Sequence, residues 1–85
     1  MHEKDVGEVL KRTQNCFREV FDQPELEIRR EMTARDVEGW ESLSHVRLIG
    51  ALEAEFKVRF TTQEIMAASD VGMLLDLVIK KSAAS

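Results

Sequence analysis

Apolar residues recur every three or four positions in three stretches of the chain, residues 5–21, 42–56 and 71–78. This spacing places their side chains on one face of an α-helix, whereas a half-buried strand would carry an apolar residue at every second position. Strand-like alternation is found nowhere in the sequence. The sequence therefore predicts an all-α fold with three substantial helices.

Signals at the helix ends set the expected boundaries. Pro24 lacks an amide proton and disfavours helix in the residue before it, so the first helix should end just before this proline. Thr61 and Glu64 have the spacing of a capping box, which predicts a short helix over residues 62–67. Asp70 is a candidate N-cap for the last helix.

The stretch between the first two helices, residues 23–41, has no sustained period. A connection this long in a compact domain is uncommon and often functional. We expect its apolar residues Leu26 and Ile28 to pin it along the helices. The predicted architecture is a four-helix bundle with three longer helices, one short helix and a long loop between helices one and two.

The length of 85 residues predicts one domain, residues 1–85, with an ordered core at about 4–81 and a fraying tail at 82–85. We expect Trp40 to pack over the loop and His45 to be solvated, while Leu43 fits either the core or an exposed contact. Helical spacing assigns the core to eight residues: Val46, Ile49, Leu52, Phe56, Phe60, Ile65, Leu74 and Val78.

The net charge of −4 comes from one segment. Residues 22–41 contain seven acidic and three basic residues, whereas the segments on either side contain equal numbers of each. Nucleic-acid backbones require a basic face, so we expect no nucleic-acid partner. A basic protein partner fits the acidic segment better.

Cys16 is the only cysteine, so the chain can form no internal disulfide and no cysteine metal cage. We expect it to be a small buried apolar residue on the first helix. The sequence also lacks a signal-peptide pattern and an apolar run long enough to cross a membrane. We therefore expect a soluble, cytoplasmic protein without membrane insertion.

Residues that could perform catalysis form no recognisable site. Ser42, His45 and Asp36 are the residue types of a catalytic triad. However, no Gly-x-Ser-x-Gly elbow surrounds the serine, and the histidine lies one helical turn away, so we expect no such triad here. The sequence shows no metal-ligand spacing and no phosphate-binding glycine loop. Ser42 fits two roles, either capping the second helix or carrying a phosphodiester whose charge the helix N-terminus offsets.

A continuous segment leads into the second predicted helix: Gly39-Trp-Glu-Ser42-Leu-Ser-His-Val-Arg-Leu-Ile, followed by Ala51-Leu-Glu-Ala-Glu-Phe56. This segment resembles the Asp-Ser-Leu attachment motif and second helix of acyl carrier proteins. Ordered matches continue through Arg59-Phe60 and Asp70-Val71, so the resemblance covers residues 5–80. It implies an acyl-carrier-like four-helix bundle.

The resemblance also implies 4′-phosphopantetheine attached covalently to Ser42, transferred from coenzyme A by a phosphopantetheinyl transferase. The terminal thiol of this arm, rather than Cys16, would hold an acyl group as a thioester. The protein would be a monomeric carrier and not an enzyme. Other enzymes would load and transfer its acyl group in a fatty-acid, polyketide or lipid pathway.

Departures from the family pattern indicate a specialised carrier. Glu41 stands where the family usually has aspartate. We expect the exposed positions of the typically acidic second helix to include Ser44, His45 and Arg47 alongside Glu53 and Glu55. Attraction to a generic basic partner should be weaker and recognition more selective. The expected recognition residues are Glu41, Leu43, Arg47 and Glu53. If the interior shelters an acyl chain, the expected cavity residues are Val46, Leu52, Phe60, Ile65 and Leu74.

Two other functions remain open at this point. A peptidyl or aminoacyl carrier would share the architecture and the modification, but it normally shows a Gly-Gly-x-Ser context, which this chain lacks around Ser42. An unmodified helical adaptor would instead bind partners through its acidic loop. Modification of Ser42 by a transferase would separate both carriers from the adaptor.

Overall fold

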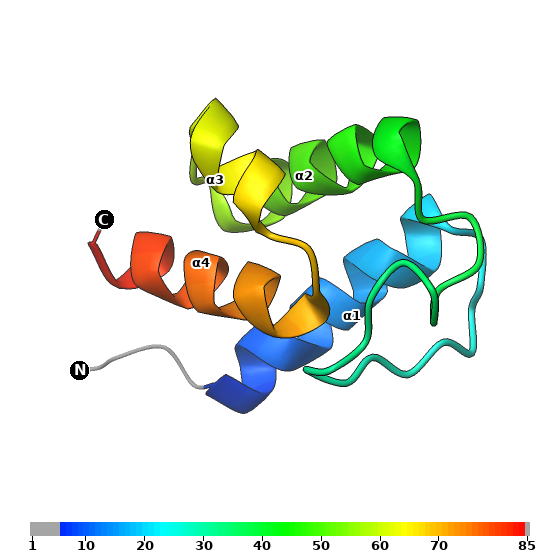
Figure 1. Cartoon of the computed structure of the whole chain (residues 1–85). Helices are drawn as coiled ribbons and strands as arrows, with labels where there is room; N and C mark the ends of the chain where they lie inside the picture. Colours follow the sequence, from blue (N-terminus) through cyan, green and yellow to red (C-terminus); the bar gives the residue numbers. More distant parts are fainter. Residues whose placement is uncertain (1–5, 85) are drawn as a thin grey trace.

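The computed structural model describes residues 6–84, which form four helices: α1 (Val6–Val20), α2 (Ser42–Phe56), α3 (Thr62–Ala67) and α4 (Val71–Ala84). Extended structure within these residues is limited to one isolated bridge, between Thr33 and Asp70. Figure 1 shows α2 and α4 lying over α1, with the short α3 joining them and the long loop at one end. The predicted all-α architecture is confirmed.

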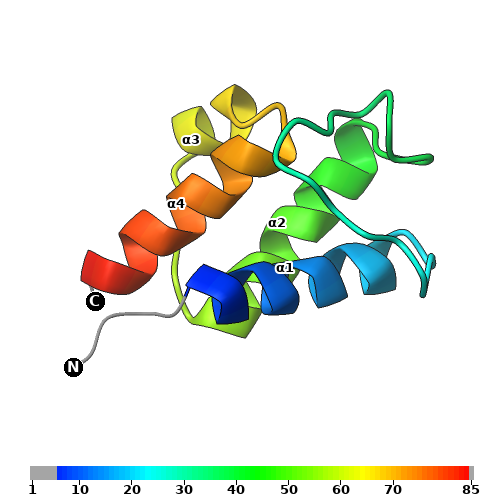
Figure 2. The ribbon, with the colours of Figure 1, turned by 90° about the horizontal axis from the view of Figure 1, so that it is seen from below.

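The three longer helices contribute side chains to one core, and Figure 2 shows the arrangement of these helices from below. Phe17 of α1, Leu52 of α2 and Leu74 of α4 are fully buried. Ile65 packs partly buried against the core. The predicted core is confirmed at six of its eight positions: Ile49, Leu52, Phe56, Phe60, Leu74 and Val78.

The prediction that Val46 belongs to the core is wrong, because its side chain is 62% exposed. Leu48, two positions further along α2, is fully buried in its place. Both residues have helical spacing to other apolar residues of α2, and only the packing of α1 and α4 on one side selects Leu48. The outward position of Val46 brings it to the surface near Ser42.

The long loop lies along the bundle, as predicted. Ile28 and Met32 are buried in the core, and Leu26 packs partly buried against it. Hydrogen bonds tie the loop to α1 and α4: Arg18 Nε donates to the Leu26 carbonyl at 2.7 Å, and the Val71 amide donates to the Met32 carbonyl at 2.9 Å. These contacts fix the path of the chain as it returns to α2.

Both predicted caps in the second half of the chain are present. The Glu64 amide donates to Thr61 Oγ1 at 3.1 Å, and the Thr61 amide donates to Glu64 Oε1 at 2.9 Å. The Met73 amide donates to Asp70 Oδ1 at 2.8 Å at the start of α4. The hydrogen bond from the Thr61 backbone, followed by the hydrogen bond from Lys81, lowers the pKa of the Glu64 carboxyl.

α4 continues to Ala84, three residues beyond the predicted ordered core, and the fraying of the tail stays a prediction. Lys81 Nζ lies 3.0 Å from Glu64 Oε1, and Ser82 is buried. The remaining parts of the predicted core and tail, residues 4–5 and Ser85, lie outside the described residues. None of the helices in the described part of the chain has the length and apolar content needed to span a bilayer.

Candidate functional site

Ser42 is the first residue of α2, and its side chain is exposed. Its hydroxyl makes no hydrogen bond to any other residue in the range 6–84. The first amides of a helix lack carbonyl partners within the helix, which leaves partial positive charge at this end. An anionic group bonded to the Ser42 oxygen would therefore reach solvent and lie beside this positive helix end.

The start of α2 is capped by Ser44 rather than Ser42. The amide of Glu41, the N-cap residue, donates to Ser44 Oγ at 2.8 Å, and the Ser44 hydroxyl donates to the Gly39 carbonyl at 2.6 Å. Gly39 has a φ of +90°, a backbone conformation that residues with a side chain rarely adopt. This conformation directs the chain toward the start of α2. Ser44, predicted to be exposed, is buried by these contacts. Of the two open roles of Ser42, capping is therefore excluded.

A hydrogen-bonded bridge links the loop, α2 and α3 beside Ser42. Trp40 Nε1 donates to His45 Nδ1 at 3.0 Å, and His45 Nε2 lies 3.0 Å from the Ile65 carbonyl oxygen. Because Nδ1 accepts, the imidazole proton is on Nε2, which donates to Ile65. The prediction that His45 is solvated is wrong, whereas the predicted packing of Trp40 is confirmed, since its side chain is 7% exposed.

The bridge depends on an aromatic cluster that the sequence did not reveal. The Trp40 ring meets Phe17 edge-on at 5.4 Å between centroids and stacks on the His45 ring at 5.9 Å. The cluster holds Trp40 in the orientation that aims its N–H at the imidazole. α3 contributes no buried residue of its own. The His45 bond to Ile65 is thus one of the few contacts that position α3 against α2.

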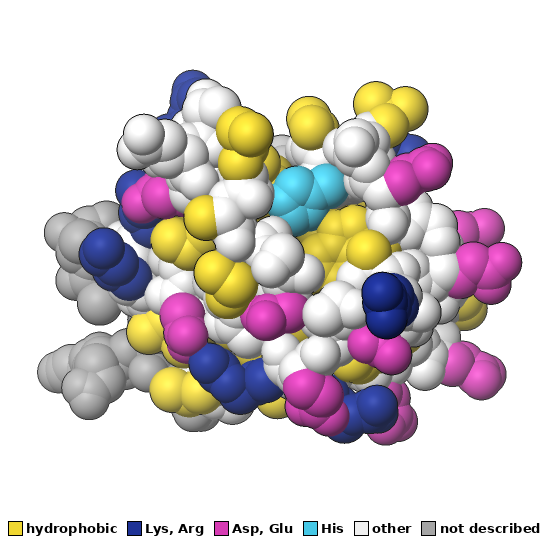
Figure 3. All heavy atoms as spheres, viewed as in Figure 1, with side chains coloured by type: hydrophobic (Ala, Val, Ile, Leu, Met, Phe, Trp, Pro, Cys, Tyr) yellow, Lys and Arg dark blue, Asp and Glu magenta, His cyan; other side chains and the backbone are white. Residues whose placement is uncertain are grey.

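A groove of about 490 Å³ opens beside Ser42 between α2 and α3. Figure 3 shows the cyan imidazole at this hollow, surrounded by hydrophobic side chains. Ser42 and Glu41 stand at its edge, and its apolar lining includes Val46 and Met66, which are 62% and 78% exposed. The groove offers an apolar surface to a group attached at Ser42.

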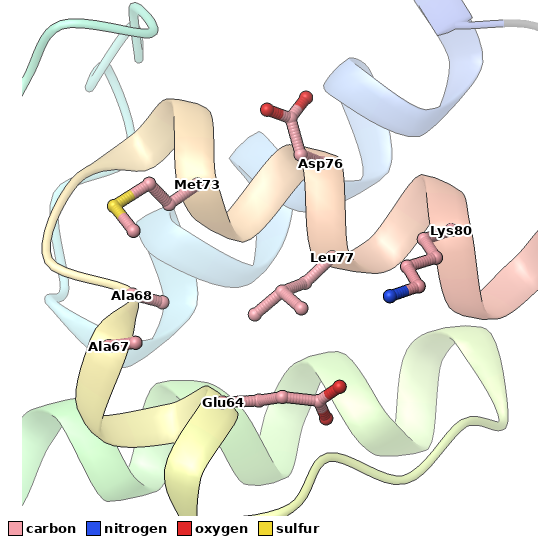
Figure 4. Close-up of a pocket in the computed structure, with 7 residues that line it drawn as sticks. All are labelled: Glu64, Ala67, Ala68, Met73, Asp76, Leu77 and Lys80. Atoms are coloured by element: carbon pink, nitrogen blue, oxygen red, sulfur yellow. The ribbon is translucent and has the colours of Figure 1, made fainter.

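A second groove, of about 300 Å³, lies between α3 and α4. Figure 4 shows Met73 and Leu77 pointing from α4 toward α3, with Glu64 and Lys80 at one end and Asp76 turned away. Ala68 lines both grooves, so they meet where α3 ends. α3 therefore separates the groove beside Ser42 from the groove along α4.

The predicted recognition residues are not brought together as one group. Glu41, Leu43 and Arg47 are exposed, Leu43 at 71%, which places this leucine at the surface and not in the core. Glu53 lies at the other end of α2, half-buried, and its Oε2 accepts a hydrogen bond from the Phe60 amide at 3.0 Å. Its carboxylate is thus engaged within the fold.

The predicted cavity residues are also divided. Val46 and Ile65 line the groove beside Ser42. Leu52, Phe60 and Leu74 are buried in the core and line neither groove. The surface groove thus shares two residues with the predicted cavity.

The single cysteine does not compete with Ser42 as a reactive group. Cys16 is buried, as predicted, and burial raises the pKa of its thiol to about 11, with the nearby Glu55 adding to the shift. The thiol is therefore protonated at neutral pH and a poor nucleophile. Within residues 6–84, no cluster of three His, Cys, Asp or Glu side chains could hold a metal ion.

Comparisons with known proteins agree on the family. Residues 11–78 match the family model described as "Phosphopantetheine attachment site". The solution structure of holo acyl carrier protein from Geobacter metallireducens is 41% identical and superposes with a TM-score of 0.83, covering 89% of this chain and 87% of that chain. The chain belongs to the acyl carrier protein family. None of the curated proteins matches it significantly.

The cofactor of the acyl carrier family is covalently attached 4′-phosphopantetheine, and the residues present here fit it. Attachment requires a hydroxyl that is exposed and not already bonded, which Ser42 supplies. The phosphodiester would lie at the N-terminus of α2, where unpaired amides favour negative charge. The apolar groove beside Ser42 leaves room for the rest of the arm.

Proposed function

We propose that this chain holds an acyl group as a thioester on 4′-phosphopantetheine attached to Ser42. The observation that supports the attachment site most is the difference between the contacts of Ser42 and Ser44. Ser44 makes the hydrogen bonds that begin α2, while the Ser42 hydroxyl is exposed and unbonded among the described residues. Nothing in the fold requires the Ser42 hydroxyl, so it is available for transfer of the arm.

The attachment reaction would be performed by a phosphopantetheinyl transferase acting on coenzyme A. The Ser42 oxygen forms a bond to the phosphorus that bears the pantetheine, the bond from that phosphorus to the adenosine bisphosphate breaks, and the hydroxyl proton passes to the transferase. The chain itself contributes an accessible hydroxyl and the positive end of α2, which stabilises the negative charge of the product. In this proposal it is a carrier and not an enzyme.

The surface near Ser42 suggests how the cargo lies. The groove between α2 and α3 is lined by Val46, Ile65 and Met66 and requires no opening of the core. Sheltering a chain among Leu52 and Leu74 would require the packed helices to separate, because both side chains are fully buried. We infer that the arm and the first carbons of its cargo rest in the surface groove.

Enzymes that load and unload the arm would dock at the start of α2, where Glu41, Leu43 and Arg47 are exposed. We leave Glu53 out of this surface, because its carboxylate holds the Phe60 amide. The mixed charge of this helix favours a specialised fatty-acid, polyketide or lipid pathway over the general fatty-acid carrier. We propose that residues 1–85 act as one carrier domain.

The attachment is tested by intact-protein mass after incubation with coenzyme A and a broad-specificity phosphopantetheinyl transferase. We expect the wild type to gain one phosphopantetheine and the Ser42→Ala variant to gain none. Gain in the variant would move the site to another residue. No gain in the wild type with several transferases would favour the unmodified adaptor.

A further inference from the structure

The exposed face of α2 has a composition unlike the acidic helix that the family pattern led us to expect. Beyond Ser42, seven residues of α2 and its C-cap are exposed. Glu55 is one of them and pairs with Arg12, and the other six are Leu43, Val46, Arg47, Gly50, Ala54 and Lys57. Their spacing of three and four places them on one side of the helix. This α2 face contains two cations, three apolar side chains and a glycine, with Glu41 at its start and the half-buried Glu53 in the groove along its second half.

Both carboxylates of α2 have a hydrogen-bond partner within the fold. Glu55 Oε2 lies 2.7 Å from Arg12 Nε of α1, and Glu53 Oε2 accepts from the Phe60 amide at 3.0 Å. In contrast, Arg47, Lys57 and the nearby exposed Arg59 form no ion pair with any of the described residues. Three cations without an ion-pair partner in the described part of the chain therefore lie along α2 and just beyond it, against two carboxylates that also lack a cationic partner there, Glu41 and Glu53.

The shape of the α2 face suits close approach by a partner. A groove of about 450 Å³ runs along its second half and is lined by Gly50, Glu53, Ala54, Lys57, Val58 and Arg59. A Cβ atom built on Gly50 would meet nothing within 4 Å, so the surface here is open. Toward Ser42, the side chains of Leu43 and Val46 stand out at 71% and 62% exposure. Apolar centres with charged margins are typical of protein interfaces.

We propose that the α2 face docks a protein partner whose surface presents carboxylates around an apolar site. The inference rests on the proposed function, because a carrier must bring Ser42 to the enzymes that use it. Charge complementarity then selects the partner: a basic docking patch would face Arg47, Lys57 and Arg59 and be repelled, whereas an acidic patch would be attracted. The seven acids of residues 22–41 belong to the loop and, apart from Glu41, are not part of this face.

The test uses two synthetic helical peptides with the same leucine-rich face, one flanked by glutamates and the other by lysines. Each is titrated into the unmodified ¹⁵N-labelled protein at low salt, and amide shifts give the affinity and the surface bound. We expect the glutamate peptide to bind more tightly, with shifts along α2. The Arg47→Glu/Arg59→Glu variant should weaken it by about two- to fivefold or more for each reversed cation.

A matched variant, Lys11→Glu/Lys80→Glu, has the same net charge but changes exposed residues of α1 and α4. It should keep most of the preference for the glutamate peptide. Lys57 is left unchanged, because its φ of 57° makes substitution there a backbone perturbation as well. Equal affinity for the two peptides, tighter binding of the lysine peptide, or equal losses in both double variants would overturn the proposal.

Because the titration uses unmodified protein, its outcome is independent of attachment at Ser42. A chain that accepts the arm but shows no charge preference would lose only the acidic-partner inference. A chain that prefers the glutamate peptide but accepts no arm would lose the proposed carrier function.

Discussion

Ser42 and Ser44 lie in the same helical turn, and we expect alanine at the two positions to have opposite consequences. Ser44 Oγ accepts from the Glu41 amide at 2.8 Å and donates to the Gly39 carbonyl at 2.6 Å, and the side chain is buried. Ser42 is exposed and makes no hydrogen bond among the described residues. Ser44→Ala should therefore destabilise the fold, whereas Ser42→Ala should remove only the attachment site.

The loss of stability in Ser44→Ala follows from the two backbone groups left without partners, the Glu41 amide and the Gly39 carbonyl. Loss of an N-terminal cap costs about 0.5–2 kcal/mol, and a buried group left unsatisfied costs about 1–3 kcal/mol. Alanine fills nearly the same volume as serine, so no cavity adds to the loss. We expect Ser44→Ala to lower the free energy of unfolding by about 1–2 kcal/mol and Ser42→Ala by less than about 0.5 kcal/mol.

Urea unfolding followed by tryptophan fluorescence measures both variants, because Trp40 is the only tryptophan and is buried next to this turn. Folded Ser44→Ala should still accept the arm in the mass assay. A loss of more than about 1 kcal/mol in Ser42→Ala would show that its hydroxyl is structural, since a free surface hydroxyl contributes little. Unchanged stability of Ser44→Ala would refute the assignment of the cap.

Three further outcomes are expected. His45→Phe keeps a ring for stacking but removes both hydrogen bonds, so it should lower the free energy of unfolding by about 1–3 kcal/mol and alter Trp40 fluorescence. His45→Gln can still donate to the Ile65 carbonyl and should recover part of this loss in the same urea titration. Gly50→Ala should raise the thermal midpoint, gaining about 0.5–1 kcal/mol, because the added Cβ meets nothing within 4 Å. Cys16, buried and with its pKa raised to about 11, should be alkylated by iodoacetamide far more slowly in the native protein than in urea at neutral pH; equal rates would show that its surroundings are open.

Local signals in the sequence were enough to predict the four helices and where α3 and α4 begin. The Thr61–Glu64 capping box and the Asp70 cap use partners within three residues, and the structure places α3 and the start of α4 where these signals predict. The family resemblance added the expected role of Ser42, which charge and periodicity did not distinguish from a cap. Recognition of Ser44 as the cap needed the path of the chain at Gly39.

Features that depend on distant contacts could not be predicted. α2 has apolar residues on more than one side, so spacing alone did not distinguish Leu48, which is buried, from Val46, which is exposed. The sequence predicts a solvated His45, because its partner, the Ile65 carbonyl, is twenty residues away and a backbone acceptor is not marked by residue type. The extension of α4 is accompanied by contact of Lys81 with Glu64 of α3, a pairing that appears only when the two helices pack together.

The central claim is that the arm is attached at Ser42 and nowhere else. Its most direct test is tandem mass spectrometry of proteolytic peptides from protein modified with coenzyme A and a transferase. We predict that fragment ions place one phosphopantetheine on Ser42, with Ser44 in the same peptide unmodified. An arm located on Ser44 or any other residue, or no arm when a control acyl carrier in the same reaction is fully modified, would contradict the claim.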